Sequence, residues 1–204
     1  MRTLLPLLTD DPHPEPRLWS AILLNMLGRF DEAWATAQEA SRRVGELTGE
    51  YGAERLLALF ATLSGNHEAA ARSWRVVCDG IEAQGNLNAL STFAPALGRS
   101  LCMLGRYDEA EPLAHLGQEL GDEQDAVTQM LWRQVQALVC SHRGQHKEAE
   151  RLAREAVFIA EGTDALTWHG DALCDLSEVL TRAGRPQDSR LPCFRCHPRS
   201  RSCL

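Results

Sequence analysis

The sequence has little of several features that would indicate a particular class of protein. Only Lys147 is a lysine, 6% of the residues are aromatic, and the net charge of −7 disfavours a broad surface for nucleic acid or an anionic membrane. No apolar run approaches the roughly 20 residues that cross a bilayer. The apolar run at the N-terminus is short, is interrupted by Pro6 and is followed by acids, unlike a signal peptide. We therefore predict a cytoplasmic protein with reduced cysteines.

Motifs that carry catalytic or cofactor chemistry are also missing. The sequence contains no phosphate-binding loop, no Gly-rich dinucleotide turn, no zinc-protease helix and no serine nucleophile elbow. Acid clusters such as GDEQD and EGTD lie at turns and helix starts, where helix capping explains them. We predict no catalytic residue, no metal site and no cofactor, and hence a protein that is not an enzyme.

What the sequence does contain is a repeated seven-residue motif. LGRFDEA at 27–33 and LGRYDEA at 104–110 are nearly identical, and degraded copies stand at 64–70, 143–149 and 183–189. The marker glycines of the five copies are Gly28, Gly65, Gly105, Gly144 and Gly184, and they are 37, 40, 39 and 40 residues apart. A near-constant period in this range indicates an array of stacked repeats.

Each marker glycine follows a segment of helical periodicity, and all but the last also precede one. Apolar residues recur at i, i+3, i+4 and i+7 in these segments. The pattern predicts a helix, a turn in which the glycine adopts the left-handed conformation, and an antiparallel second helix. The acids that follow suit the start of the second helix because its dipole favours negative charge there. We expect the aromatic residue or histidine after the turn to fill the gap between the helices, and the five tryptophans to pack in the core. The alanine that ends four of the motif copies lets two helices approach closely; these are Ala33, Ala70, Ala110 and Ala149.

These features resemble the tetratricopeptide repeat. The small residues of AERLAREA (149–156) match the family's ladder of small residues, and ALGRSL (96–101) matches its Leu-Gly pair and following large residue. The period near 39 departs from the family's period of about 34, and the Leu-Gly pair is missing from the second and fourth units. The resemblance implies an all-α fold, a right-handed superhelix of antiparallel helix hairpins. We place the array at 16–188, with about four and a half helix pairs, after a loop or linker at 1–15.

Arrays with a period longer than about 34 residues resemble a second group of proteins. Residues 160–188 in particular are similar to the C-terminal repeat regions of bacterial adenylate/guanylate cyclase-like ATPases and of large ATP-dependent transcriptional regulators. This resemblance implies a regulatory C-terminal fragment that acts in cis on an ATPase or cyclase domain outside this chain. The interpretation we favour is a non-catalytic scaffold that binds a protein or peptide partner.

The family's groove geometry implies where a partner would bind. It places the first helix of each pair on the concave face and points to a set of polar side chains there: Asn25, Arg55, Thr62, Arg99, Gln134, Ser141, Asp171, Glu178 and Thr181. We expect a face that is basic in its middle and acidic at its C-terminal end, along which a bound peptide can align. The family's Lys/Asn clamp for chaperone C-termini is absent, because Lys147 belongs to a second helix.

Residues 189–204 differ from the rest of the chain. They contain four arginines and no acid, lack helical periodicity, and are predicted to form a disordered basic tail. CFRCH (193–197) matches the spacing of c-type haem attachment, and four side chains could hold zinc, but a tail without function is the favoured interpretation. The four side chains are Cys193, Cys196, His197 and Cys203. Because this tail cannot cover the helix expected at 165–182, we expect truncation or a frameshift near Ser189 and self-association through the uncovered helix.

Overall fold

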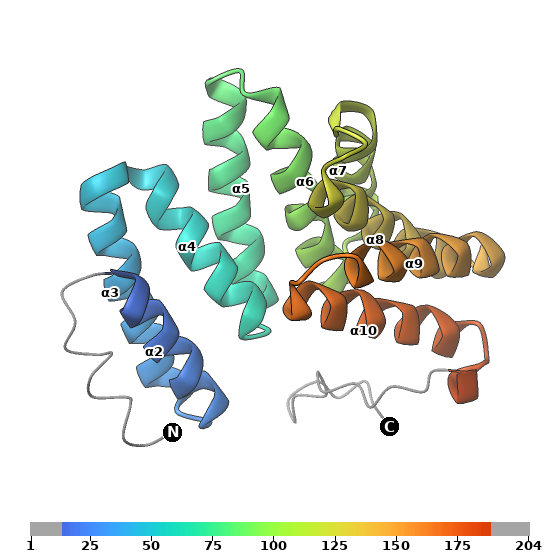
Figure 1. The fold of residues 1–204 in the computed structure, drawn as a ribbon, viewed down its shortest axis with the longest axis horizontal. Coiled ribbons are helices and arrows are strands. Elements are labelled where there is room, and N and C mark those ends of the chain that lie inside the picture. The colour runs from blue at the N-terminus through green and yellow to red at the C-terminus, as the bar shows by residue number, and fades with distance from the viewer. Residues whose placement is uncertain (1–13, 189–204) are drawn as a thin grey trace. The chain divides into compact units, whose positions relative to one another are not determined.

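The computed structural model describes residues 14–188, which form nine α-helices and a short 3-10 helix, and no strand (Figure 1). The predicted all-α fold of helix hairpins is confirmed. The cysteine-rich tail and the first 13 residues lie outside the described residues. The elements are α2 (Pro14–Met26), α3 (Phe30–Thr48), α4 (Glu50–Leu63), α5 (His67–Ala83), α6 (Leu87–Met103), α7 (Tyr107–Leu120), α8 (Ala126–His142), α9 (His146–Glu161), α10 (Leu166–Arg182) and η1 (Pro186–Asp188).

The contacts divide the chain into two compact units, Met1–Gly80 and Ile81–Leu204. In the first unit α2 packs against α3, α3 against α4, and α2 also against α4. In the second unit the helices from α6 to α10 pack consecutively, and α8 additionally contacts both α6 and α10. Contacts between neighbours in sequence and between every second helix are the contacts of stacked hairpins.

The marker glycines end the first helix of each hairpin, as predicted. All five have a φ angle between 73° and 76°, in the left-handed region. At the fourth corner the N–H of Gln145 donates to the carbonyl of Cys140 (2.9 Å), and the N–H of Gly144 donates to the carbonyl of Ser141 (3.1 Å). This pair of hydrogen bonds is the Schellman motif, and it recurs at the other four corners. The repeated motif is therefore a helix C-cap joined to a helix start.

The rest of the motif starts the second helix. The arginine after the glycine pairs with the glutamate one turn along: Arg29 Nε lies 2.8 Å from Glu32 Oε1, and Arg106 Nε lies 2.6 Å from Glu109 Oε1. The alanine that follows is buried in all four copies that have one. In RFDEA and RYDEA, the arginine and the glutamate therefore form an ion pair at the corner, and the alanine allows the two helices to pack closely.

Small side chains bring the helices of each unit close together. Three of the five buried residues in the core between α2, α3 and α4 are alanines, and Phe60 packs there with its ring centroid 5.9 Å from that of Trp34. In the second unit, a Cβ added to Gly98 would lie 3.2 Å from the carbonyl oxygen of Ala110, which explains the glycine of the Leu-Gly pair. No described helix combines the length and the hydropathy needed to span a membrane.

The expected burial of the tryptophans is only partly correct. Trp74 and Trp132 are buried and Trp34 is half-buried, as expected. Trp19, however, is 61% exposed and Trp168 is also exposed. The helical spacing places both tryptophans on the apolar face of their helices. No described helix, however, packs over these two rings.

Substitution of Gly144 by alanine tests the corner. We expect the free energy of unfolding to fall by about 1–2 kcal/mol, because the side chain disfavours the left-handed conformation. The cost is one of backbone conformation alone, since no heavy atom lies within 4 Å of an added Cβ. The measurement is urea denaturation followed by circular dichroism.

Gly170→Ala is the matched control, since Gly170 also has no heavy atom within 4 Å of an added Cβ but lies inside α10. This change should raise the free energy of unfolding by about 0.5–1 kcal/mol. Equal effects of the two substitutions would contradict the role assigned to Gly144.

Candidate partner-binding site

The first helices of the hairpins can be aligned by counting back from the marker glycine. The predicted partner-binding residues all lie three, six, ten or thirteen positions before it. These offsets place residues on one face of a helix. Arg99, Leu138 and Glu178 share the position six before the glycine, and Leu59 occupies the same position in α4.

In the second unit, three of the predicted residues cluster with a fourth residue that was not predicted. The missed residue is Asp175 of α10, whose carboxylate receives both arms of the Arg99 guanidinium from α6 (Nε–Oδ2 2.7 Å, Nη2–Oδ1 2.9 Å). Gln134 of α8 donates to the same carboxylate (Nε2–Oδ2 2.8 Å). Arg99 also reaches Asp171 (Nη1–Oδ2 3.2 Å). Asp175 stands one helical turn after Asp171, and that spacing is the signal that could have identified it.

We call the cluster of Arg99, Gln134, Asp171 and Asp175 the buried network, because all of its members except the half-buried Asp171 are internal. Arg99 is 4% exposed, Gln134 1% and Asp175 3%, and Ser141 is buried as well. We expected Arg99, Gln134 and Ser141 to face an open groove. The structure places all three in the interior. There Arg99 and Gln134 contact Asp175 of α10 instead of solvent.

The guanidinium of Arg99 is balanced by the carboxylate of Asp175, and the half-buried Asp171 adds a second carboxylate at the edge of the network. Burial lowers the pKa of the Arg99 guanidinium, but the carboxylates of Asp175 and Asp171 outweigh that effect and raise this pKa above its ordinary value. Arg99 is therefore charged at every relevant pH. A buried charge of this kind depends on its partner, since removal of the partner leaves an uncompensated charge in a medium of low dielectric constant.

A second contact fixes the far end of α10. Tyr107, the aromatic residue after the third corner, is buried and stacks on His142 with ring centroids 4.1 Å apart. Arg182 donates to the Tyr107 hydroxyl (2.8 Å) and pairs with Glu178 (Nη2–Oε1 2.8 Å). Tyr107 thus fills the gap at its corner as predicted, whereas Phe30 in the first copy is exposed.

Of the predicted residues on α10, Glu178 and Asp171 are half-buried and held in ion pairs, and Thr181 is exposed.

In the first unit the predicted residues are more accessible. Asn25 and Thr62 are half-buried, and the Thr62 hydroxyl accepts a hydrogen bond from Trp74 Nε1 of α5 (3.1 Å). Arg55 is exposed and has no ion pair or hydrogen-bonded partner among the described residues. It shares one face of α4 with Leu59, which is 38% exposed, and Leu63, which is 47% exposed. We call Arg55, Leu59 and Leu63 the α4 stripe.

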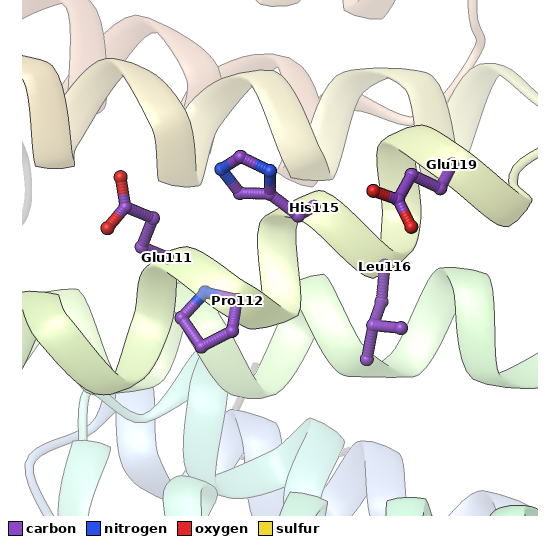
Figure 2. Close-up of a pocket in the computed structure, with 5 residues that line it drawn as sticks. All are labelled: Glu111, Pro112, His115, Leu116 and Glu119. Atoms are coloured by element: carbon purple, nitrogen blue, oxygen red, sulfur yellow. The ribbon is translucent and has the colours of Figure 1, made fainter.

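An open hollow of about 560 Å³ lies along α7. Figure 2 shows that its five lining side chains all come from this helix. One of them, Glu111, is already held by Arg143 through two hydrogen bonds of 2.6 and 2.7 Å. A hollow lined by one helix lacks the convergent polar groups from several elements that typify a ligand pocket.

The described residues include no group of three or more His, Cys, Asp or Glu side chains placed to hold a metal ion. Four cysteines are described, and all are free thiols. Burial raises the pKa of the Cys102 thiol to about 12, and the charge of Asp175 acts in the same direction. Because the thiolate is the reactive form, Cys102 is chemically inert at neutral pH.

Comparison with known proteins supports a repeat array. The model of the tetratricopeptide repeat family matches residues 135–155, which span part of α8, the Gly144 corner and the start of α9. The matched segment contains Ala149 and Ala153, both of which are buried. No curated protein matches the chain. The glycine corners, the alanine contacts and this match together support an array of tetratricopeptide-like hairpins.

Substitution of Arg99 by methionine tests the buried network. We expect the free energy of unfolding to fall by about 3–5 kcal/mol, because Asp175 would remain buried with only the Gln134 amide as its partner. Urea denaturation provides the measurement. Arg106→Met is the matched control: its ion pair with Glu109 is exposed, so its effect should be far smaller.

The double variant Arg99→Met, Asp175→Leu removes both buried charges. It should recover most of the lost stability, since apolar side chains of similar size can replace a buried ion pair. A double variant as unstable as Arg99→Met would show that the loss comes from packing and not from charge.

Proposed function

We propose that this chain is a protein-interaction scaffold that binds a polypeptide partner and catalyses no reaction. The observation that carries the proposal is the stack of helix hairpins, with the tetratricopeptide match on one of them. Repeats of this kind generally mediate protein–protein interaction, because stacked hairpins build an extended surface from many side chains.

The exposed side chains of the predicted inner face support a site in the first unit. In the second unit, Arg99 and Gln134 are engaged inside the buried network. In the first unit, Arg55 lies exposed beside two exposed leucines. Exposed apolar side chains next to a charged group are typical of protein-binding surfaces.

Two further predictions belong to this proposal. The first is a cytoplasmic location. The second is the alternative role as the regulatory C-terminal region of a signalling ATPase, cyclase or transcriptional regulator, and it rests on the resemblance of residues 160–188. In that role the array would bind a domain of its own polypeptide instead of a separate partner.

Panning of a random peptide library against the full chain tests the scaffold function. We expect the same sequence pattern to recur in independent pannings, and the recovered peptides to compete for one site with micromolar dissociation constants in calorimetry. Failure of any pattern to recur would contradict the proposal. Chain unfolded in urea and immobilised in the same way is the control for nonspecific adsorption.

Self-association through α10 is a separate proposal, and two exposed side chains of that helix support it. Leu166 and Trp168 both face solvent near its start. Light scattering should show a mass that rises with concentration, and Leu166→Ser should suppress this rise. Leu47→Ser, at an equally exposed leucine of α3, is the matched control and should have no effect. A monomer at all concentrations would refute self-association.

A further inference from the structure

We propose that the α4 stripe binds an amphipathic helix of the partner, which places its apolar face on Leu59 and Leu63 and a carboxylate against Arg55. This inference rests on the proposed scaffold function and names the surface and the chemistry of the partner. Three observations carry it: the register of Leu59, the free charge of Arg55, and the way α10 engages Arg99 in the second unit.

The register of Leu59 marks it as a contact position. The residue six places before the marker glycine is buried in α6, where it is Arg99, and in α8, where it is Leu138. In α4 the same position holds an exposed leucine, and Leu63 lies exposed one turn further along. On α2, which packs against α4, Trp19 and Met26 are also exposed and lie seven residues apart on one face. Adjacent first helices thus each present large apolar side chains to solvent.

The charge of Arg55 is uncompensated within the described residues. Each of the eight arginines described in the second unit has a carboxylate partner within ion-pair distance. Arg55 has none, and no acidic residue shares its face of α4. A guanidinium group presents a planar fork that matches a carboxylate, so an acidic side chain is the complementary group.

The buried network shows this recognition inside the protein. There a helix, α10, presents two carboxylates one turn apart to Arg99 of α6. The α4 stripe also combines an arginine with contact positions on a first helix, although Arg55 stands ten places before its marker glycine and Arg99 six, and no acidic helix of the described chain engages it. A helix with leucines at i and i+4 and a glutamate one turn away on the same face would complement it.

Binding of a designed peptide to the full chain tests the inference. The probe is a synthetic helical peptide with that leucine and glutamate pattern, and its comparison peptide carries lysine in place of the glutamate. Calorimetry should show about fivefold tighter binding of the glutamate peptide, the difference expected for one partly exposed ion pair. Arg55→Glu should reverse this preference, and Leu59→Asp should weaken both peptides at least tenfold. Circular dichroism of each variant confirms that it is folded.

Arg72→Glu is the matched control, because Arg72 is also exposed and has no ion-pair partner between residues 14 and 188, but lies on α5, a second helix. It should leave the preference between the two peptides unchanged. Equal responses of the Arg55 and Arg72 variants would overturn the inference, since they would show only a long-range effect of net charge.

The outcomes separate this inference from the scaffold function. If peptides recovered by panning bind the wild type and also bind Arg55→Glu and Leu59→Asp equally well, the scaffold function stands and the α4 stripe is not its site. If the wild type binds neither recovered nor designed peptides, both proposals fail.

Discussion

The structure depends on one local constraint, the reversal of the chain at a left-handed glycine. A helix must end with its last carbonyl groups satisfied, and here the Schellman hydrogen bonds around glycines such as Gly144 satisfy them while turning the chain back. Because the same corner recurs about every 39 residues, the chain becomes a series of helix hairpins. The alanine that follows, for example Ala149, then sets how closely the two helices pack.

The two units use the same hairpin to different effect. In the second unit the first helices bring polar residues into contact, and the Arg99–Asp175 pair joins α6 to α10 across 76 residues of sequence. Such a pair adds little net stability but strongly penalises any arrangement in which the charges separate. In the first unit the corresponding face of α4 carries an exposed arginine and two exposed leucines. Partner binding is proposed for the first unit because its α4 face is accessible, whereas the corresponding side chains of the second unit are buried.

The proposed interaction role rests on the stacked hairpins and on the exposed side chains of the α4 stripe. The buried charges of Arg99 and Asp175 neutralise each other, the Cys102 thiol is protonated, and the hollow along α7 is lined by a single helix. The α4 stripe, by contrast, presents one arginine and two leucines to solvent. Its natural complement is a side-chain pattern on another polypeptide, which is how stacked repeats obtain affinity from many weak contacts.

The sequence by itself determined the helix hairpins, their corners and their buried alanines, because these are local features with a fixed period. The resemblance to the tetratricopeptide repeat also singled out Arg99, Gln134 and Asp171 as polar residues of the first helices. The sequence did not identify Asp175 or the exposure of Trp19. Whether a polar residue on an inner face meets solvent or another helix depends on how closely successive hairpins approach. That approach is set by packing between residues distant in sequence, so only the tertiary structure decided which inner-face residues are buried and which remain accessible to a partner.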